Sequence, residues 1–256
     1  MARLTAVALP ALPEIQPGAD LVELIADSWR EAAVADPELR PRDGDALVVT
    51  QKIVSKAEGR LVDLRTVKPR QAAVDFATKW DRDARQVEVV LRESVEVLRM
   101  ERGLVISRTH HGFVCANAGV DASNTGRPDT VTLLPKDPDA SARRLRDGLC
   151  QAFGVGVAVL VSDSFGRPWR FGIVDVALGV AGFAPLDDQR GQPDADGRTM
   201  RSTIVAVADE VCSAAELAAG KTSRRPVVLV RGVELQPGEG SVTRDVVMPR
   251  EFDLFP

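Results

Sequence analysis

Apolar side chains recur along the chain in short blocks, and their spacing predicts both helices and strands. From Asp20 to Val34 the spacing is helical, with Asp20 as a capping residue after a Pro-Gly pair, so an amphipathic helix is expected. Residues 46–50 form a β-branched run after a turn and predict a buried strand. Further strands are predicted at residues 87–91, 104–108, 155–162 and 227–230, and residues 113–116 form another apolar run.

Polar segments separate these blocks and complete the predicted order of elements. Residues 69–83 predict a charged helix, and residues 185–198, rich in Asp, Gly and Pro, predict a surface loop. A long helix is expected from residue 199 to residue 219, with Gly220 as its C-terminal cap and Pro226 preventing extension. Strands and helices mix without regular alternation, so the expected fold class is mixed α/β (α+β), treated as one unit over residues 1–256.

The composition is that of a soluble globular protein, with 45% hydrophobic and 27% charged residues. The net charge of -4 is small and the basic residues are scattered, which argues against nucleic acid as a partner. A small anionic ligand is favoured instead, held by a few local cations such as Lys52, Lys56, Arg167 and Arg170. The three cysteines lie too far apart for a disulfide framework or a zinc site. No apolar run approaches the ~18 residues of a membrane helix, so a cytoplasmic protein without a membrane partner is expected.

Two polar pairs follow predicted strands and are candidate metal ligands. Asp121 lies near Asn124, and Asp163 is followed by Ser164. Oxygen ligands at strand ends often converge on one crevice in α/β proteins and suit Mg²⁺ or Mn²⁺. The alternative is that each is a turn residue that bonds its own backbone.

Arg167 and Arg170 flank Pro168-Trp169, a turn that carries two guanidinium groups and a large ring. Two arginines at this spacing could clamp a phosphate or a carboxylate, and the alternative is a surface turn with a half-buried tryptophan. The two histidines, His110 and His111, are adjacent, and neighbours on a strand face opposite sides, so at most one of them is expected to be functional.

The usual nucleotide and hydrolase signatures are missing from the sequence. Gly220-Lys221-Thr222 could end a phosphate loop, but Ala215 stands where that loop needs a glycine and a predicted helix precedes it. Lys221 could instead complement the helix dipole. There is neither a Rossmann fingerprint nor a Gly-x-Ser-x-Gly nucleophile elbow.

Four segments taken together resemble the coenzyme F-420-0:L-glutamate ligases. These segments are residues 51–60, 116–124, 162–170 and 213–221. Their order and spacing match as well, and the similarity extends from Leu12-Pro13-Glu14-Ile15 to about Gly232. It therefore covers nearly the whole chain and is more specific than any single motif.

The resemblance implies an intertwined homodimer that lacks a phosphate loop. It also implies an enzyme that uses GTP and a divalent metal, Mn²⁺ or Mg²⁺, to join L-glutamate to the phospholactate carboxylate of coenzyme F-420-0, with further γ-linked glutamates. An acyl phosphate is the expected intermediate, and a monovalent cation is a further candidate cofactor. The rival readings are a ligase of the same scaffold for another carboxylate or amino acid, and a catalytically silent nucleotide-binding subunit.

By the same resemblance, Asp121 and Asp163 match metal ligands, and Ser164 lies next to a second ion. Lys56 with Arg167 and Arg170 is expected at the phosphate oxygens. The positions expected around the nucleotide are Leu12, Pro13, Glu14, Ile15, Gln51, Lys56, Asn124, Gly220 and Lys221. Some relatives have glutamine at position 221 and serine at position 51. Because a charged lysine cannot ligate a metal, Lys221 is assigned to phosphate neutralisation.

Overall fold

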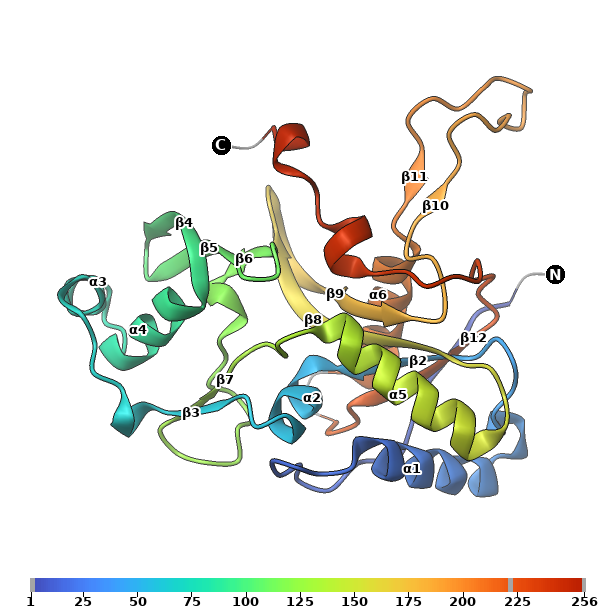
Figure 1. Cartoon of the computed structure of the whole chain (residues 1–256), viewed down its shortest axis with the longest axis horizontal. Coiled ribbons are helices and arrows are strands. Elements are labelled where there is room, and N and C mark those ends of the chain that lie inside the picture. Colours follow the sequence, from blue (N-terminus) through green and yellow to red (C-terminus); the bar gives the residue numbers. More distant parts are fainter. Residues whose placement is uncertain (1–2, 221–222, 255–256) are drawn as a thin grey trace.

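The computed structural model describes residues 3–220 and 223–254, so Lys221 lies outside the described residues. Its centre is a five-stranded sheet, here called the main sheet (Figure 1). In spatial order its strands are β1 (Thr5–Ala8), β12 (Val227–Arg231), β2 (Ala46–Thr50), β8 (Ala158–Arg167) and β9 (Arg170–Ala181). β2 and β8 run parallel, and the other neighbours are antiparallel.

Helices cover both faces of the main sheet. On β2, Leu47 and Val49 pack against α1 (Leu21–Ala35) and α5 (Pro138–Phe153), whereas Ala46 and Val48 face α6 (Val207–Ala219). Alternate side chains of one strand thus enter two separate cores. This is why the strands of the main sheet read as continuous apolar runs rather than as alternating patterns.

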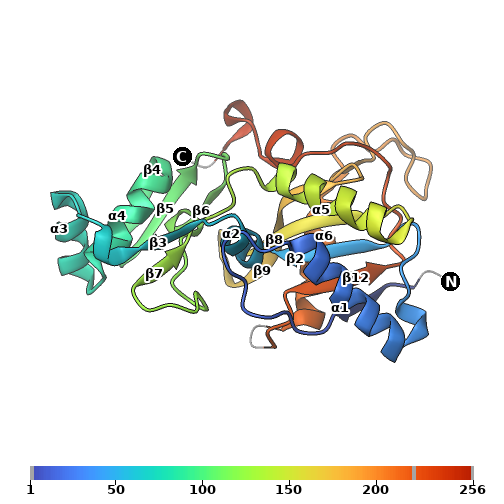
Figure 2. The same cartoon turned by 60° about the horizontal axis from the view of Figure 1, so that its bottom comes forward.

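Residues from about 60 to 135 form a lobe with its own buried core at one end of the molecule (Figures 1 and 2). Its strands are β3 (Leu61–Asp63), β4 (Ser94–Glu101), β5 (Leu104–Thr109), β6 (Val114–Ala116) and β7 (Thr130–Thr132). Its helices are α3 (Gln71–Trp80) and α4 (Ala84–Glu93). The short helix α2 (Gln51–Ala57) leads from β2 into this lobe.

A narrow arm, formed by the chain between β9 and α6, projects from the body (Figure 1, orange). Its base is the two-stranded pair β10 (Asp187–Asp188) and β11 (Ile204–Val205). The predicted surface loop at residues 185–198 falls in this arm. The remaining chain contains short helical turns at Pro37–Leu39, Leu64–Thr66, Asn117–Gly119, Val242–Val246 and Arg250–Phe252.

The mixed α/β class is confirmed, and so are several predicted elements. The Asp20 carboxylate caps α1 by accepting a bond of 3.0 Å from the Val22 N–H. The strands expected at residues 46–50, 104–108 and 227–230 are β2, β5 and β12, and the expected charged helix at 69–83 contains α3. Gly220 is the C-terminal cap of α6, and its N–H donates to the Glu216 carbonyl.

One element was predicted with the wrong type, and two elements were predicted with the wrong boundaries. Residues 87–91 lie in α4 and not in a strand, because Val87 and Val90 pack into the lobe core one helical turn apart. The long helix begins only at Val207, and the eight residues before it belong to the arm and its exit. The strand expected at 155–162 begins at Ala158 and continues to Arg167, because β9 pairs with it through the polar residues.

None of the helices formed by residues 3–220 and 223–254 has the length and apolarity needed to cross a bilayer. The three cysteines are free thiols, with Cys115 and Cys212 buried and Cys150 half-buried. Burial raises the pKa of the Cys115 thiol to about 12.

The lobe contains a buried carboxylate whose ionisation should stabilise the protein. Glu88 of α4 accepts bonds from the side chains of Arg70 and Arg92, and the Arg70 bonds are the main reason that its pKa falls from 4.5 to about 2. A depressed pKa stabilises the folded state above the unfolded value, and this contribution is lost as the pH falls from about 4.5 to about 2.

We therefore expect Glu88→Gln to lower the unfolding free energy by about 1 to 2 kcal/mol at pH 7. The loss should shrink as the pH falls through that interval. Urea unfolding at a series of pH values measures it. Asp75→Asn is the control, because Asp75 is exposed on α3, where it accepts a surface bond from Gln71, and should give a smaller change. Equal effects at both positions would contradict the expectation.

Candidate active site

The only parallel pair within the main sheet directs two chain segments to one edge. Thr50 of β2 lies beside Ser162 of β8, so the residues that follow them leave at the same side of the sheet. After β2 comes α2 with its two lysines, and after Ser162 comes the polar half of β8. The carboxyl ends of parallel strands are the usual place for ligands in open α/β sheets. We call this region the carboxyl edge.

Asp121 reaches the carboxyl edge from the loop before β7. Its backbone pairs with Thr132, and its Oδ2 accepts a bond of 2.6 Å from Lys52 Nζ. The Ser123 N–H donates to Oδ1 at 2.6 Å, and Lys52 Nζ also donates to the Ser123 carbonyl at 2.8 Å. Burial alone would raise the pKa of Asp121, but the bonds from Lys52 and Ser123 outweigh it, so the pKa is lowered. Asp121 is therefore an anion with a cation already beside it.

Asp163 has the opposite electrostatic character. Loss of water around the carboxyl raises its pKa to about 7, and the negative charges of Asp175 and Asp121 add to the rise. The Ser164 N–H and the charge of Lys52 oppose it. A positive ion near Asp163 would relieve this repulsion and favour the ionised form.

Asp163 and Ser164 do not lie past the end of the strand as predicted, but inside β8. Their cross-strand partners in β9 are Val176 and Asp175, and adjacent strand residues face opposite sides of a sheet. The two side chains therefore do not point into one pocket from a common turn. Ser164 faces the side of the sheet on which it bonds Asp175, and Asp163 faces the other side.

Asp175 is a functional candidate that the sequence reasoning missed. It lies in β9, is only 6% exposed, and its Oδ1 accepts a bond of 2.5 Å from the Ser164 hydroxyl. The hydroxyl of Ser162 donates to Oδ2 at 3.2 Å. The signal was in the sequence, because Asp175 is the one charged residue in the apolar stretch 173–183.

Lys56 is a buried residue of a helix. It lies in α2, is 5% exposed, and forms an ion pair with Glu14. A side chain at Gly126 would come within 2.8 Å of Glu14 Oε1, so the loop that carries Asn124 packs against the same carboxylate. The Leu12–Ile15 segment, α2 and this loop thus meet, although they are far apart in the sequence. Asn124 is exposed, with a positive φ of 51°.

Gln51 lies in α2, and Gly220 lies at the end of α6. Gln51 is buried, and its Oε1 accepts a bond of 2.8 Å from the Ser55 hydroxyl inside α2. Gly220 ends α6, which runs along β9. The Ser213 hydroxyl of α6 donates a bond of 2.8 Å to the Asp175 carbonyl. The chain then returns to the carboxyl edge, where the Pro226 carbonyl accepts a bond from the Thr50 N–H.

The two arginines lie at the far end of the β8–β9 hairpin. Arg167 and Arg170 are cross-strand partners, and Arg167 is roughly 13 Å along the strand from Asp163 at about 3.3 Å per residue. The Arg167 Nε is buried without a hydrogen-bond partner among the described residues. Trp169 between them is 82% exposed, so the alternative of a half-buried tryptophan is wrong. The arginines are not brought next to the carboxylates within one chain.

The histidines belong to the lobe and not to the carboxyl edge. They lie in the turn between β5 and β6, so the premise that they share a strand was wrong. His111 Nε2 lies 2.8 Å from the Pro135 carbonyl oxygen, and burial lowers the pKa of the ring. Its surroundings are those of a structural side chain.

The oxygen atoms at the carboxyl edge are chemically suited to a hard divalent ion. Carboxylates are ligands that Mg²⁺ and Mn²⁺ prefer, and Asp121 and Asp163 supply them, whereas the Ser164 hydroxyl faces the other side of β8 and bonds Asp175. Within residues 3–220 and 223–254, however, no three His, Cys, Asp or Glu side chains stand together as a ready-made metal cluster. An ion here would need further oxygen ligands from water or from a substrate phosphate.

Comparison with known proteins identifies the family of this chain. Residues 11–232 match the family model described as F420-0:Gamma-glutamyl ligase. The chain is 40% identical over 255 residues to the coenzyme F420:L-glutamate ligase of Methanothermobacter thermautotrophicus, covering 98% of both chains. It is 41% identical over 251 residues to the protein of the same name from Methanopyrus kandleri, covering 96% of this chain and 95% of that one. The chain therefore belongs to the F420-0:gamma-glutamyl ligase family.

Proposed function

We propose that this chain joins L-glutamate to the phospholactate carboxylate of coenzyme F-420-0, using GTP and a divalent metal. The observation that carries the proposal is the meeting of two carboxylates and two lysines at the carboxyl edge of a chain in this family. A carboxylate cannot be attacked by an amine until one of its oxygens becomes a leaving group. Transfer of a phosphoryl group to that oxygen supplies the leaving group, and charged side chains at the edge are what such a transfer requires.

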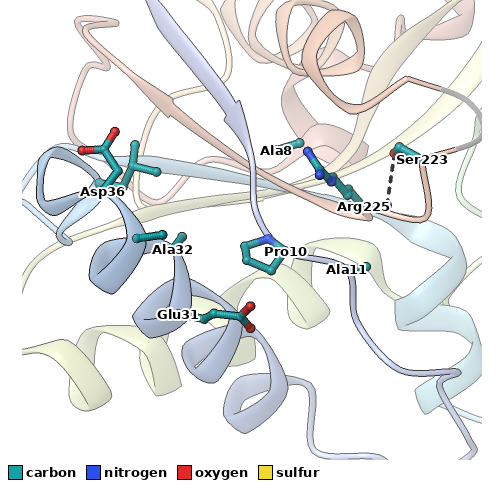
Figure 3. A pocket seen from close by; sticks show the side chains of 10 residues that line it. Ala8, Pro10, Ala11, Glu31, Ala32, Asp36, Ser223 and Arg225 are labelled. Atoms are coloured by element: carbon teal, nitrogen blue, oxygen red, sulfur yellow. Dashed lines mark hydrogen bonds between the residues drawn. The ribbon is translucent and has the colours of Figure 1, made fainter.

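The order of the strands supports a nucleotide lying across the carboxyl edge. From β8 to β1 the edge presents Asp163, then α2 after β2, then the residues before β12, then the end of β1. Three strand spacings of about 4.8 Å give roughly 14 Å, which is comparable to an extended nucleoside triphosphate. At the β1 end lies a pocket of about 520 Å³ (Figure 3).

The lining of this pocket suits the base of the nucleotide. Glu31 of α1 and Asp36, which follows the end of α1, can accept hydrogen bonds from ring N–H groups, and Arg225 can donate to a ring oxygen (Figure 3). A guanine carries both kinds of group. Ala11 in its wall directly precedes the Leu12–Ile15 segment, and Ser223 and Arg225 in its wall follow the end of α6 in the sequence. This agrees with the use of GTP.

The chemistry then proceeds in two transfers. The γ-phosphoryl group passes from GTP to the substrate carboxylate and gives an acyl phosphate and GDP. The glutamate amine attacks the acyl carbon, the C–N bond forms, and inorganic phosphate leaves with the electron pair of the C–O bond. Asp121 and Asp163 would hold the divalent ion, Mg²⁺ or Mn²⁺, which offsets phosphate charge when bound. Lys52 and Lys56 would balance the remaining charge, and a monovalent cation is a further candidate.

A single assay tests this proposal. The protein is mixed with coenzyme F-420-0, GTP, Mn²⁺ and L-glutamate, and mass spectrometry follows the deazaflavin. We expect a product heavier by one glutamyl residue and one GDP formed per residue added. Product formation with another amino acid but not with glutamate would indicate a related ligase. GTP binding without any product would indicate a silent subunit.

We further propose that the chain forms a homodimer. Trp169, Phe171 and Ile173 expose apolar side chains along the end of the β8–β9 hairpin, and the arm projects beyond the body. Contiguous exposed apolar side chains of this kind commonly mark protein interfaces. A second chain would also bring partners to Arg167 and Arg170, which lie away from the carboxylates of their own chain.

Light scattering at micromolar concentration is therefore expected to give about twice the chain mass of 27.5 kDa. Phe171→Ser should shift the population toward monomer, because it removes apolar area from the proposed interface. Val34→Ser is the matched control, since Val34 is an exposed apolar residue on α1. A monomeric wild-type protein would contradict the proposal.

A further inference from the structure

A second cavity, here called the lobe cavity, lies at the small sheet formed by β3 and β7. These two strands lie side by side where the lobe meets α2 (Figures 1 and 2). The cavity measures about 320 Å³ and is lined by Leu61, Asp63, Arg65, Arg127, Pro128 and Thr130. None of these residues has a role in the proposed function.

The charged side chains of the lobe cavity leave one positive charge in excess. Arg65 donates two bonds to Asp63, from Nε at 2.9 Å and from Nη2 at 2.7 Å, so these two charges offset each other. Arg127, for which the described part of the chain supplies no ion-pair partner, donates instead to the neutral amide oxygen of Gln16 at 2.8 Å. A guanidinium in this state can bind an incoming carboxylate through two parallel hydrogen bonds.

The lobe cavity lies on the same face of the small sheet as the Asp121 carboxylate. Directly opposed residues of antiparallel strands direct their side chains to one face. Leu61 of β3 is opposite Thr132 of β7, and Thr132 is in turn opposite Asp121. Two strand spacings of about 4.8 Å put Leu61 and Asp121 roughly 10 Å apart. A ligand in the cavity therefore lies about one small-molecule length from the carboxyl edge.

The loop before β7 borders both the lobe cavity and the surroundings of Lys56. A side chain at Gly126 would come within 2.8 Å of Oε1 of Glu14, the ion-pair partner of Lys56. Arg127, the next residue, lines the cavity and bonds Gln16. The cavity and the proposed phosphate site thus meet the same loop.

We propose that the lobe cavity binds the incoming L-glutamate, with Arg127 holding one of its carboxylates and the amine directed toward the carboxyl edge. The inference rests on the proposed function, which needs an acidic amino acid near this edge. Glutamate carries a net charge of about −1 at pH 7, which is opposite to the excess charge of the lining.

The other substrates and the other cavity fit this assignment less well. The pocket beside α1 has an excess of negative charge, because Glu31 and Asp36 outnumber Arg225 in its lining. It therefore disfavours an acidic amino acid. The volume of about 320 Å³ is at the small end for ligand pockets, so the lobe cavity suits an amino acid rather than the ring system of a deazaflavin.

The first test compares the Michaelis constants of the three substrates. Arg127→Met keeps an apolar stem without the guanidinium and is expected to raise KM for L-glutamate at least about tenfold, because a bond to a charged group is lost. The values of kcat and of KM for GTP and coenzyme F-420-0 should stay within about threefold, since an anchoring contact is equal in the ground and transition states. Arg127→Lys keeps the charge and should recover most of the loss.

The second test measures glutamate binding without turnover. Saturation-transfer NMR of L-glutamate, with a non-hydrolysable GTP analogue present, should show binding to the wild-type protein and a much weaker signal with Arg127→Met. Arg99→Met is the matched control, because Arg99 is an exposed arginine of β4 in the same lobe that does not line the cavity. Gln16→Ala removes the partner of Arg127 but leaves the guanidinium, so it should bind glutamate like wild type.

Three outcomes would overturn the glutamate site. One is a rise in KM for coenzyme F-420-0 with KM for glutamate unchanged, which would place the tail of that substrate in the cavity. Another is an unchanged KM and NMR signal in Arg127→Met. The third is a full loss in Gln16→Ala, which would mean that Arg127 acts by holding the segment at Gln16. If the wild-type protein forms no product but its glutamate signal depends on Arg127, the proposed function fails and the glutamate site stands.

Discussion

Replacing Asp163 with asparagine is expected to lower turnover at least about a hundredfold, which corresponds to about 2.7 kcal/mol of transition-state stabilisation. The reason is that an anionic ligand holds the ion whose charge acts mainly during phosphoryl transfer. Asparagine keeps the size of the side chain but not its charge. The rate should be measured at saturating GTP over a range of Mn²⁺ concentrations, with Asp27→Asn on the exposed side of α1 as the control. Wild-type turnover of Asp163→Asn at limiting metal would refute the assignment.

The same substitution should not destabilise the protein. The pKa of Asp163 is raised from 3.8 to about 7, so its ionisation disfavours the folded state. This penalty is absent below about pH 4, grows as the pH rises toward 7, and is complete above it. Because the side chain is only partly shielded from water, we expect Asp163→Asn to raise the unfolding free energy at pH 8 by about 1 to 2 kcal/mol in the presence of a chelator. A loss of stability would mean that Asp163 has a structural role.

Lys56→Met is expected to lower kcat/KM for GTP roughly 30- to 1000-fold. This corresponds to a loss of about 2 to 4 kcal/mol of transition-state stabilisation. Lys56 is buried beside the segments that meet at the carboxyl edge, and a compact ammonium there can neutralise phosphate oxygens. Stability should change by no more than about 1 kcal/mol, because methionine keeps the apolar stem and the half-exposed Glu14 can be hydrated. Steady-state kinetics with GTP varied at saturating metal measures the loss.

Two further variants separate a phosphate contact from an anchoring role for Lys56. Lys68→Met removes an exposed lysine of the lobe and should leave kcat/KM unchanged. Glu14→Gln breaks the ion pair but leaves the ammonium, so it should cost less than Lys56→Met. If Glu14→Gln reproduces the full loss, Lys56 acts by anchoring the Leu12–Ile15 segment. A loss below about threefold for Lys56→Met would leave the phosphate site without this cation.

Local sequence patterns predicted correctly the elements in which the spacing of apolar residues alone indicates which faces are buried. The strands β2 and β12 are apolar on both faces, and α1 has an apolar stripe and a capping aspartate. The type of α4 was missed, because a run of valines favours a strand locally and only the lobe core selects the helix. The polar half of β8 was missed because its strand form depends on pairing with β9.

The candidate site was likewise predictable only in part from the local sequence. The sequence singled out Asp121 and Asp163, and the structure has them close enough for the charge of one to raise the pKa of the other. No pattern in the sequence indicated that Lys52 would bond to Asp121, 69 residues away, or that Lys56 would pair with Glu14. Such contacts depend on how the α2 helix and the loop before β7 are brought together. Asp175 had a visible signal, but its partner became evident only from the register of β8 and β9.

The position of β12 in the main sheet bears on how the chain is synthesised and folds. β12 lies between β1 and β2, although it is made long after both of them. On the ribosome, the edges of β1 and β2 that it joins therefore stay unpaired until residues 227–231 have emerged. Pairing over such sequence separations makes folding slow, and open strand edges favour aggregation in the meantime. Any truncation before Val227 should thus yield an insoluble fragment and not a smaller folded enzyme, and chaperone capacity should limit how much protein a host can produce.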